Sequence, residues 1–250
     1  MTHAGARVVI TAGGAGIGAC LARRFAEQGA QVAYCDVDPG EVPEGMLGVA
    51  ADVTDEAQMA AFFARVEETM GGVDVLCANA GIGGPAAGIA DMSLGDWRAT
   101  LSANLDGAFL ATRWAAPLMS AQGAGSIMLT SSTSGLWGVP TRAPYVVAKW
   151  GVIGLMKTLA MELGPAGVRV NAVAPGAVEG PRMERVLAKE AAAKGCSVED
   201  VRALYAEGTS LRTWVTAEDI ADMVLFVTSD AGKRISGQTL AVDGHTERMT

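Results

Sequence analysis

The sequence predicts an α/β fold in which a doubly wound parallel sheet of about seven strands carries helices on both faces. Short apolar runs rich in β-branched residues alternate with helical segments along the whole chain. A glycine-rich turn at residues 11–18 joins the first apolar run to the first helical segment. The 250 residues, 50% of them hydrophobic, are enough for one large core, so we expect a single domain over residues 1–250.

The first half of the chain predicts strands and helices in alternation. Continuous apolar runs indicate strands at residues 7–11, 31–36, 47–51 and 73–78, because a parallel strand covered on both faces has no polar side. Apolar residues at helical spacing predict helices at residues 17–29 and 55–69. Gly29, at the end of the first of these helices, is a common residue for a helix C-terminus.

The second half continues the alternation with one interruption. We expect a long helix at residues 96–119, a strand at 126–131, a helix at 144–163, a strand at 168–173, a helix at 216–229 and a last strand at 238–242. Residues 179–212 interrupt this pattern, because they are charged and helix-prone and come after a Pro175-Gly176 turn. We interpret this segment as an inserted substrate lid within the single domain.

Charge and apolar content exclude several classes of partner. The net charge is -8 with an isoelectric point near 4.8, and there is no basic run, so a nucleic-acid partner is not expected. No apolar run approaches the length needed to cross a bilayer, so no membrane partner is expected either. The first strand begins by about Arg7, which leaves no room for a leader peptide, and we therefore expect a cytoplasmic protein.

The cysteines and histidines do not suggest a metal site. Cys20, Cys35, Cys77 and Cys196 lie far apart, and three of them fall in apolar segments, where we expect reduced core thiols. The two histidines lie near opposite ends of the chain, and no Cys-x-x-Cys occurs. We predict no bound metal.

The turn at residues 11–18 is suited to bind a dinucleotide. It reads Thr-Ala-Gly-Gly-Ala-Gly-Ile-Gly, and residues without side chains let a pyrophosphate approach backbone N–H groups at the positive end of a helix. Asp36 ends the second strand, eighteen residues beyond Gly18. A carboxylate at this place can accept hydrogen bonds from both hydroxyls of an adenosine ribose, and it repels a 2′-phosphate. We therefore expect an NAD-binding Rossmann domain. A purely structural turn and a solvated aspartate are the alternatives.

Tyr145 and Lys149 form a second candidate site. Residues four apart share one face of a helix, so the spacing places an ammonium beside a phenol. Lowering a tyrosine pKa from about 10 toward 7 requires roughly 4 kcal/mol, which a cation in a desolvated site can supply with help from a nicotinamide charge. The pair therefore predicts a general acid/base, and a buried tyrosine with a solvated lysine is the alternative.

In their order along the chain, these motifs resemble those of the short-chain dehydrogenase/reductase family of the 250-residue type. The resemblance extends from the first strand to the end of the chain. Ser132 precedes Tyr145 by thirteen residues, as the catalytic serine of that family does. The other matching motifs are residues 11–18, Asp52-Val53, Ala78-Asn79-Ala80-Gly81, Asn104, Pro175-Gly176 and Val242-Asp243-Gly244.

The resemblance implies hydride transfer between NAD and a secondary alcohol or ketone, of the alcohol, polyol or sugar type. Tyr145 would be the acid/base, Lys149 would lower its pKa and bind the nicotinamide ribose, Ser132 would orient the substrate oxygen and Asn104 would hold a relay water. A homotetramer is also implied. The implied cofactor-binding residues are Tyr145 and Lys149 together with Ala12, Gly14, Gly16, Ile17, Gly18, Asp36, Asp52, Val53, Asn79, Ala80, Gly81, Pro175, Gly176 and Val178.

Three residues depart from the family pattern. Ala12 replaces the first glycine of the turn, which narrows the approach on the adenosine side, and Ala78 replaces an asparagine at a position we interpret as structural. Gly180 stands where the family often has a threonine that contacts the nicotinamide amide. The change at Gly180 concerns the nicotinamide contact and not the reaction.

Two other functions remain open. A carbonyl reductase of the 3-oxoacyl-(acyl-carrier-protein) type shares nearly every motif, but such biosynthetic enzymes usually draw on the phosphorylated cofactor that Asp36 disfavours. A non-catalytic dinucleotide-binding sensor would not need Ser132, Tyr145 and Lys149. The segments expected to wall the substrate contain Trp137, Arg142, Arg182, Arg185, Tyr205 and Trp214. These arginines could recognise an anion or lie solvated, and the sequence names no substrate.

Overall fold

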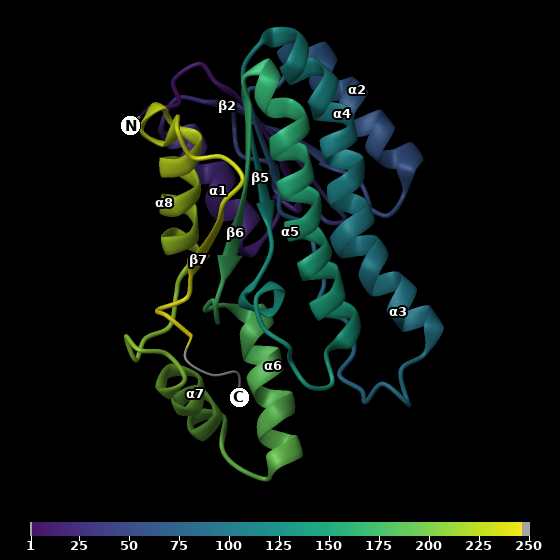
Figure 1. Ribbon diagram of the computed structural model, residues 1–250, viewed down its shortest axis with the longest axis vertical. Helices are drawn as coiled ribbons and strands as arrows, with labels where there is room; N and C mark the ends of the chain where they lie inside the picture. The colour runs from purple at the N-terminus through teal and green to yellow at the C-terminus, as the bar shows by residue number, and fades with distance from the viewer. Residues whose placement is uncertain (1, 247–250) are drawn as a thin grey trace.

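The computed structural model describes residues 2–246 and contains one seven-stranded parallel sheet (Figure 1). The strand order is β3-β2-β1-β4-β5-β6-β7, which confirms the doubly wound Rossmann arrangement. Residue 1 and residues 247–250, which the expected domain includes, lie outside the described residues. The strands are β1 Arg7–Thr11, β2 Gln31–Asp36, β3 Leu47–Ala50, β4 Val75–Ala78, β5 Gly125–Thr130, β6 Val168–Pro175 and β7 Thr239–Val242.

Helices cover both faces of the sheet in two layers (Figure 1). On one face pack α1 (Gly16–Glu27) and α8 (Ala217–Thr228), whose buried side chains form a core with β1 and β2. On the other face pack α2 (Glu56–Met70), α4 (Gly107–Gln122) and α5 (Ala143–Leu163). Burial on both faces explains why β4 and the middle of β1 carry only apolar side chains. Short 3₁₀ turns are η2 Thr133–Gly135, η3 Gly164–Ala166 and η4 Asp230–Gly232.

Helix ends follow local side-chain chemistry. The Asp55 carboxylate accepts hydrogen bonds from two backbone N–H groups at the start of α2, and Gly71 ends that helix with φ 68°. Thr216 and Asp219 form a reciprocal capping box at the start of α8. The expected helix at residues 55–69 therefore begins one residue later, because Asp55 is its cap.

The long helix expected at residues 96–119 is wrong in its interior and in its limits. The helical path starts at α3 (Leu94–Leu101), passes through a π-helical segment η1 (Ser102–Asp106) and continues as α4. The Asn104 side-chain amide donates to the carbonyl of Thr100 (2.8 Å) and to that of Ile82 (2.9 Å). The side chain thus uses a carbonyl that an α-helix would pair with the backbone N–H of the same residue, and the turn widens.

Residues 179–212 form a separate helical unit beyond the carboxyl ends of the strands (Figure 1). It consists of α6 (Pro181–Lys194) and α7 (Val198–Glu207). Leu187, Ala191 and Val201 form its own small buried cluster. Within residues 2–246, no helix has the length and apolarity that a bilayer crossing requires.

Candidate active site

Tyr145 and Lys149 lie one turn apart at the start of α5, beside the carboxyl end of β5. The Lys149 ammonium is buried and lies 5.7 Å from the centroid of the tyrosine ring. It donates a 2.9 Å hydrogen bond to the carbonyl of Thr130, the last residue of β5. Sheet and helix together therefore hold a cation against the phenol, as the four-residue spacing predicts.

The electrostatics around Tyr145 favour its ionised form. Burial alone would raise the pKa of the phenol, but Lys149, Arg182, a hydrogen bond with Ser132 and Arg142 outweigh that effect and bring the pKa below its ordinary value. Burial in turn lowers the pKa of Lys149, while Tyr145 raises it. The phenol is thus a group that can exchange a proton closer to neutral pH than a free tyrosine can.

Ser132 and Asn104 approach this pair from two other elements. Ser132 follows β5, and its hydroxyl accepts a hydrogen bond from the Ser134 N–H (3.1 Å) while interacting with the phenol. A Cβ atom placed on Gly81 would lie 3.1 Å from Lys149 Nζ and would clash with Asn104 Oδ1, so both atoms face the same small space. Asn104 Oδ1 is buried and accepts no hydrogen bond from any described residue. An acceptor and an ammonium facing one space can hold a water between them.

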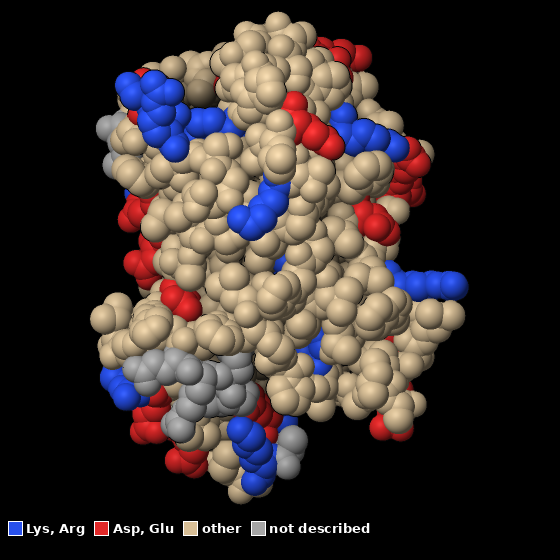
Figure 2. All heavy atoms as spheres, viewed as in Figure 1, with Lys and Arg blue, Asp and Glu red and all other residues tan. Residues whose placement is uncertain are grey.

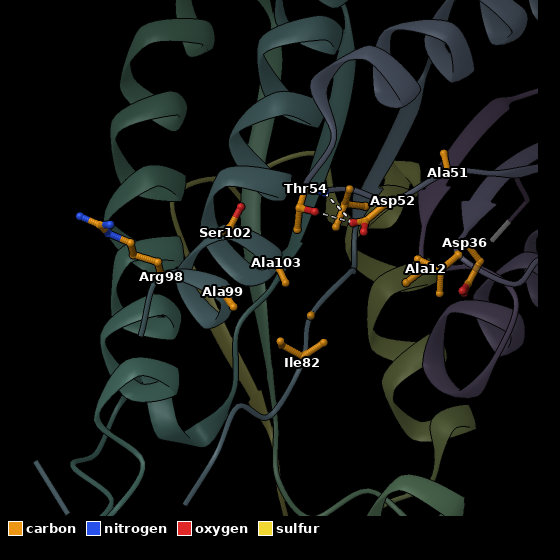
Figure 3. Close-up of a pocket in the computed structure, with 13 residues that line it drawn as sticks. Ala12, Asp36, Ala51, Asp52, Thr54, Ile82, Arg98, Ala99, Ser102 and Ala103 are labelled. Carbon is orange, nitrogen blue, oxygen red and sulfur yellow. Dashed lines mark hydrogen bonds between the residues drawn. The ribbon is translucent and has the colours of Figure 1, made fainter. Parts of the chain in front are cut away.

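A cleft of about 660 Å³ runs along the carboxyl ends of the first strands (Figure 3). Asp36 and Ala12 lie at one end of it, and Arg98 lies at the other (Figure 3). The volume suits a nucleoside-sized ligand. The lining residues are Ala12, Asp36, Val37, Ala51, Asp52, Val53, Thr54, Gly81, Ile82, Arg98, Ala99, Ser102 and Ala103.

The glycine turn meets Asp36 at this cleft. The Asp36 carboxylate accepts hydrogen bonds from the backbone N–H groups of Gly14 (3.0 Å) and Asp38 (3.2 Å), which fix its position. Gly18 must lack a side chain, because a Cβ atom there would clash with the carbonyl oxygen of Ala12. Ala12 itself has a φ of 56°, a left-handed conformation that costs an alanine roughly 1 kcal/mol more than a glycine.

The structure brings only some of the expected cofactor residues to the lining of the cleft. Those that line it are Ala12, Asp36, Asp52, Val53 and Gly81. Those that lie outside the lining are Gly14, Gly16, Ile17, Gly18, Asn79, Ala80, Tyr145, Lys149, Pro175, Gly176 and Val178.

Asn79 mainly joins strands. Its side-chain amide donates to the carbonyls of Thr11 and Ala12, and its Oδ1 accepts from the Thr130 hydroxyl. The Thr11 hydroxyl accepts from the N–H groups of Asn79 and Ala80. These bonds fix the ends of β1, β4 and β5 relative to one another. Val178 likewise pairs with Val215 in an isolated bridge.

The expected substrate-wall residues lie in different surroundings. Tyr205 and Trp214 pack against the small core of α6 and α7, with ring centroids 5.7 Å apart. Trp137 is half exposed. Arg142 and Arg182 act on the Tyr145 phenol, and Arg185 is exposed on α6.

Sequence comparison places these features in a known family. The sequence model of a family described as enoyl-(acyl carrier protein) reductase matches residues 11–245. A cis-4-hydroxycyclohexanecarboxylate dehydrogenase of Sinomonas cyclohexanicum is 36% identical, over 94% of both chains. The chain is a member of the short-chain dehydrogenase/reductase family. It is therefore an oxidoreductase. This agrees with the function that its motifs predict, and not with the alternative of a non-catalytic dinucleotide-binding sensor.

Two other proteins similar to this short-chain dehydrogenase/reductase have names that indicate different reactions. A 3-oxoacyl-(acyl-carrier-protein) reductase of Mycobacterium avium is 36% identical, over 95% of this chain and 88% of its own. The structure of an NAD⁺-bound xylitol dehydrogenase superposes with a TM-score of 0.91 and 26% identity, covering 98% of this chain and all of the other (100%). The family thus includes both alcohol oxidation and keto reduction.

Proposed function

We propose that the protein transfers hydride between NAD and a secondary alcohol or its ketone, with Tyr145 as the acid/base. One observation carries this proposal: Lys149, which helps to hold the pKa of the Tyr145 phenol below its ordinary value, faces Gly81 in the lining of a cleft that ends at a fixed Asp36 carboxylate. The names of relatives support it, since they include dehydrogenases of hydroxy acids and a polyol.

The residues present fit NAD. Asp36 is positioned to accept hydrogen bonds from the adenosine ribose hydroxyls, and the space beside Gly16 is open to a pyrophosphate, because a Cβ atom there would meet no other atom within 4 Å. Asp52, Val53 and Gly81 line the intervening cleft. When bound, the nicotinamide supplies the carbon that accepts or returns the hydride.

The protein's own residues handle the proton. In alcohol oxidation the ionised Tyr145 takes the hydroxyl proton, and in ketone reduction the neutral phenol returns it. Ser132 donates to the substrate oxygen and keeps it next to the phenol. Lys149 lowers the pKa of Tyr145, and Asn104 Oδ1 with Lys149 Nζ holds the water that carries the proton onward.

The proposed function is tested by following the absorbance of reduced nicotinamide. NAD and NADP would each be offered with secondary alcohols, polyols, aldoses and hydroxy acids, and the corresponding ketones with the reduced cofactors. We expect turnover of at least one class with NAD. Failure of every class, with both cofactors and in both directions, would overturn the proposal.

A second function, reduction of a 3-oxoacyl-(acyl-carrier-protein), is supported by the name of the relative from Mycobacterium avium. Asp36 argues against it where that reaction draws on the phosphorylated cofactor, because no lysine or arginine lies at residues 13–15 or 37 to bind a 2′-phosphate. Efficient reduction of an acyl-carrier-protein thioester with NADPH would favour this second function.

We also propose that the enzyme is a homotetramer that associates partly through α5. The face over this helix carries few charged side chains (Figure 2). Val147, Trp150 and Met161 of α5 and Phe109 of α4 are exposed apolar side chains on these helices. Exposed apolar surface of this kind marks interfaces between copies. We expect light scattering at micromolar concentration to give four times the chain mass of 25.5 kDa, and a monomer mass would contradict this proposal.

Residues 179–212 are proposed to act as a lid over the substrate. Their buried cluster contains three residues, so little apolar area stabilises this unit on its own. We expect its amides to exchange with deuterium faster than those of β1 and β4 in the free protein, and to slow when NAD and substrate bind. Exchange as slow as in the central strands without any ligand would contradict the lid role.

A cytoplasmic location is proposed from the state of the cysteines. All four are free, and burial raises the pKa of Cys35 and Cys77 to about 12, which makes them unreactive core thiols. Fractionation of the source cells tests this location.

A further inference from the structure

Two arginines converge beside the catalytic tyrosine. Arg142 precedes α5, and its guanidinium carbon lies 4.9 Å from the centroid of the Tyr145 ring. Arg182 lies in the first turn of α6, a different helix. A Cβ atom placed on Gly83 would lie 3.3 Å from Arg142 Nη2 and 3.6 Å from Arg182 Nη2. Both guanidinium groups therefore reach the same point, which a side chain at position 83 would occupy.

Within residues 2–246, these two cations have no carboxylate counter-ion. Among residues 2–246, neither arginine has a carboxylate oxygen within 4.0 Å. The nearby acids of α6 are engaged elsewhere, since Glu184 pairs with Arg202 and Glu190 pairs with Lys194 and accepts from Tyr205. Arg142 donates through Nη2 to the Gly83 carbonyl (3.1 Å), while its Nε is buried and has no partner in the described part of the chain.

Arg142 and Arg182 add two cations beyond the one that the acid/base unit needs. Lys149 already provides a fixed cation next to the phenol, and among the nearby charges it has the largest effect in lowering the Tyr145 pKa. Arg142 is partly buried, so holding its charge beside Lys149 costs free energy that a bound anion would offset, whereas Arg182 is exposed and its guanidinium is accessible to a ligand. The protein as a whole is acidic, with a net charge of -8, whereas three cations lie around the Tyr145 phenol.

We propose that Arg142 and Arg182 bind a carboxylate of the substrate, so that the enzyme acts on hydroxy acids and the matching oxo acids. A guanidinium presents planar, paired N–H donors that match a carboxylate, and the buried Nε of Arg142 has no acceptor among residues 2–246. The two arginines fix the acid end of the molecule while Ser132 and Tyr145 hold its hydroxyl end. This inference rests on the proposed function, because it names the substrate class of the same site.

The test compares each hydroxy acid with its methyl ester, which keeps the carbinol and removes the charge. The probes are 3-hydroxybutyrate and 4-hydroxycyclohexanecarboxylate with their esters, using wild type, Arg142→Gln, Arg182→Gln and, as a matched loss of charge on α6, Lys189→Gln. Lys189 is exposed and makes no ion pair with a described residue. The ester reports any change in Tyr145 acidity, so the ratio of kcat/KM for acid over ester reports recognition of the anion alone.

We expect wild type to prefer the acid of at least one pair, and each arginine variant to lose about tenfold or more of that ratio, while Lys189→Gln keeps it. An unchanged ratio in both arginine variants would overturn the inference. So would a wild type that turns over the esters as efficiently as the acids. A rise in the KM for NAD with an unchanged ratio would assign the arginines to the cofactor instead.

A binding measurement separates this inference from the proposed function. Titration calorimetry would compare cyclohexanecarboxylate with cyclohexanecarboxamide on the protein saturated with NAD. We expect tighter binding of the carboxylate to wild type and loss of that difference in Arg142→Gln and Arg182→Gln. Carboxylate binding without hydride transfer from any alcohol would overturn the proposed function alone, whereas equal binding of the two probes would overturn the inference.

Discussion

Tyr145→Phe is expected to lower turnover by about 10³-fold or more while leaving NAD affinity nearly unchanged. The substitution removes only the phenolic oxygen. Burial raises the pKa of this phenol, and the nearby residues lower it: Lys149, Arg182, Ser132 and Arg142. The ring stays in place between Arg142 and Lys149, so packing is preserved. Steady-state kinetics and calorimetric titration with NAD would measure the two quantities separately.

Lys149→Ala provides the contrasting variant. The ammonium acts on the phenol and is proposed to bind the nicotinamide ribose, so both turnover and NAD affinity should fall. Its loss also leaves the Thr130 carbonyl without its donor, so the melting temperature must be checked beside wild type. A Tyr145→Phe protein with substantial activity would refute the acid/base assignment, whatever the lysine variant shows.

Preference for NAD over NADP is the second large effect, and we expect it to be on the order of a hundredfold or more in kcat/KM. A 2′-phosphate would meet the Asp36 carboxylate, which two backbone N–H groups hold in place. Arg98 is the one basic residue among those that line the cleft, and it lies at the end remote from Asp36 (Figure 3). Repulsion at the ribose therefore has no local compensation.

Substitutions at the end of β2 should change this preference in a graded way. Asp36→Ala should narrow it, and Val37→Arg added to that change should narrow it further, because Val37 is exposed at the cleft. Asp38→Ala is the matched control. It removes an equal charge two residues beyond Asp36, and the Asp38 side chain does not line the cleft. Equal efficiency of NAD and NADP in wild type would show that Asp36 does not select the cofactor.

Local sequence patterns predict the parts of this site that depend on local chemistry. The Tyr145–Lys149 spacing places both groups on one face of α5 whatever surrounds them. Asp36 at the end of β2 follows from the length of the first β-α-β unit, in the same way. The turn at residues 11–18 leaves little space for side chains, and the glycines in its sequence show this directly.

The features that the sequence does not predict depend on contacts between distant segments. The π-helical turn at η1 arises because Asn104 reaches the carbonyl of Ile82, twenty-two residues away in the chain. Arg98, Ala99, Ser102 and Ala103 line the cleft only because α3 and η1 pack beside the segment after β4. No motif marks them. The meeting of Arg142 and Arg182 at Gly83 likewise joins three segments that are far apart in sequence.

Hydride transfer with Tyr145 as the acid/base is tested most directly by transfer of deuterium from a substrate carbinol carbon to the cofactor. A secondary alcohol that wild type oxidises would be labelled at that carbon and incubated with NAD, and the reduced cofactor would be examined by mass spectrometry and proton NMR. We expect one deuterium at the reactive carbon of the nicotinamide with wild type, and almost none with Tyr145→Phe over the same time. Reduced NAD without deuterium, or equal labelling by the Tyr145→Phe protein, would contradict it.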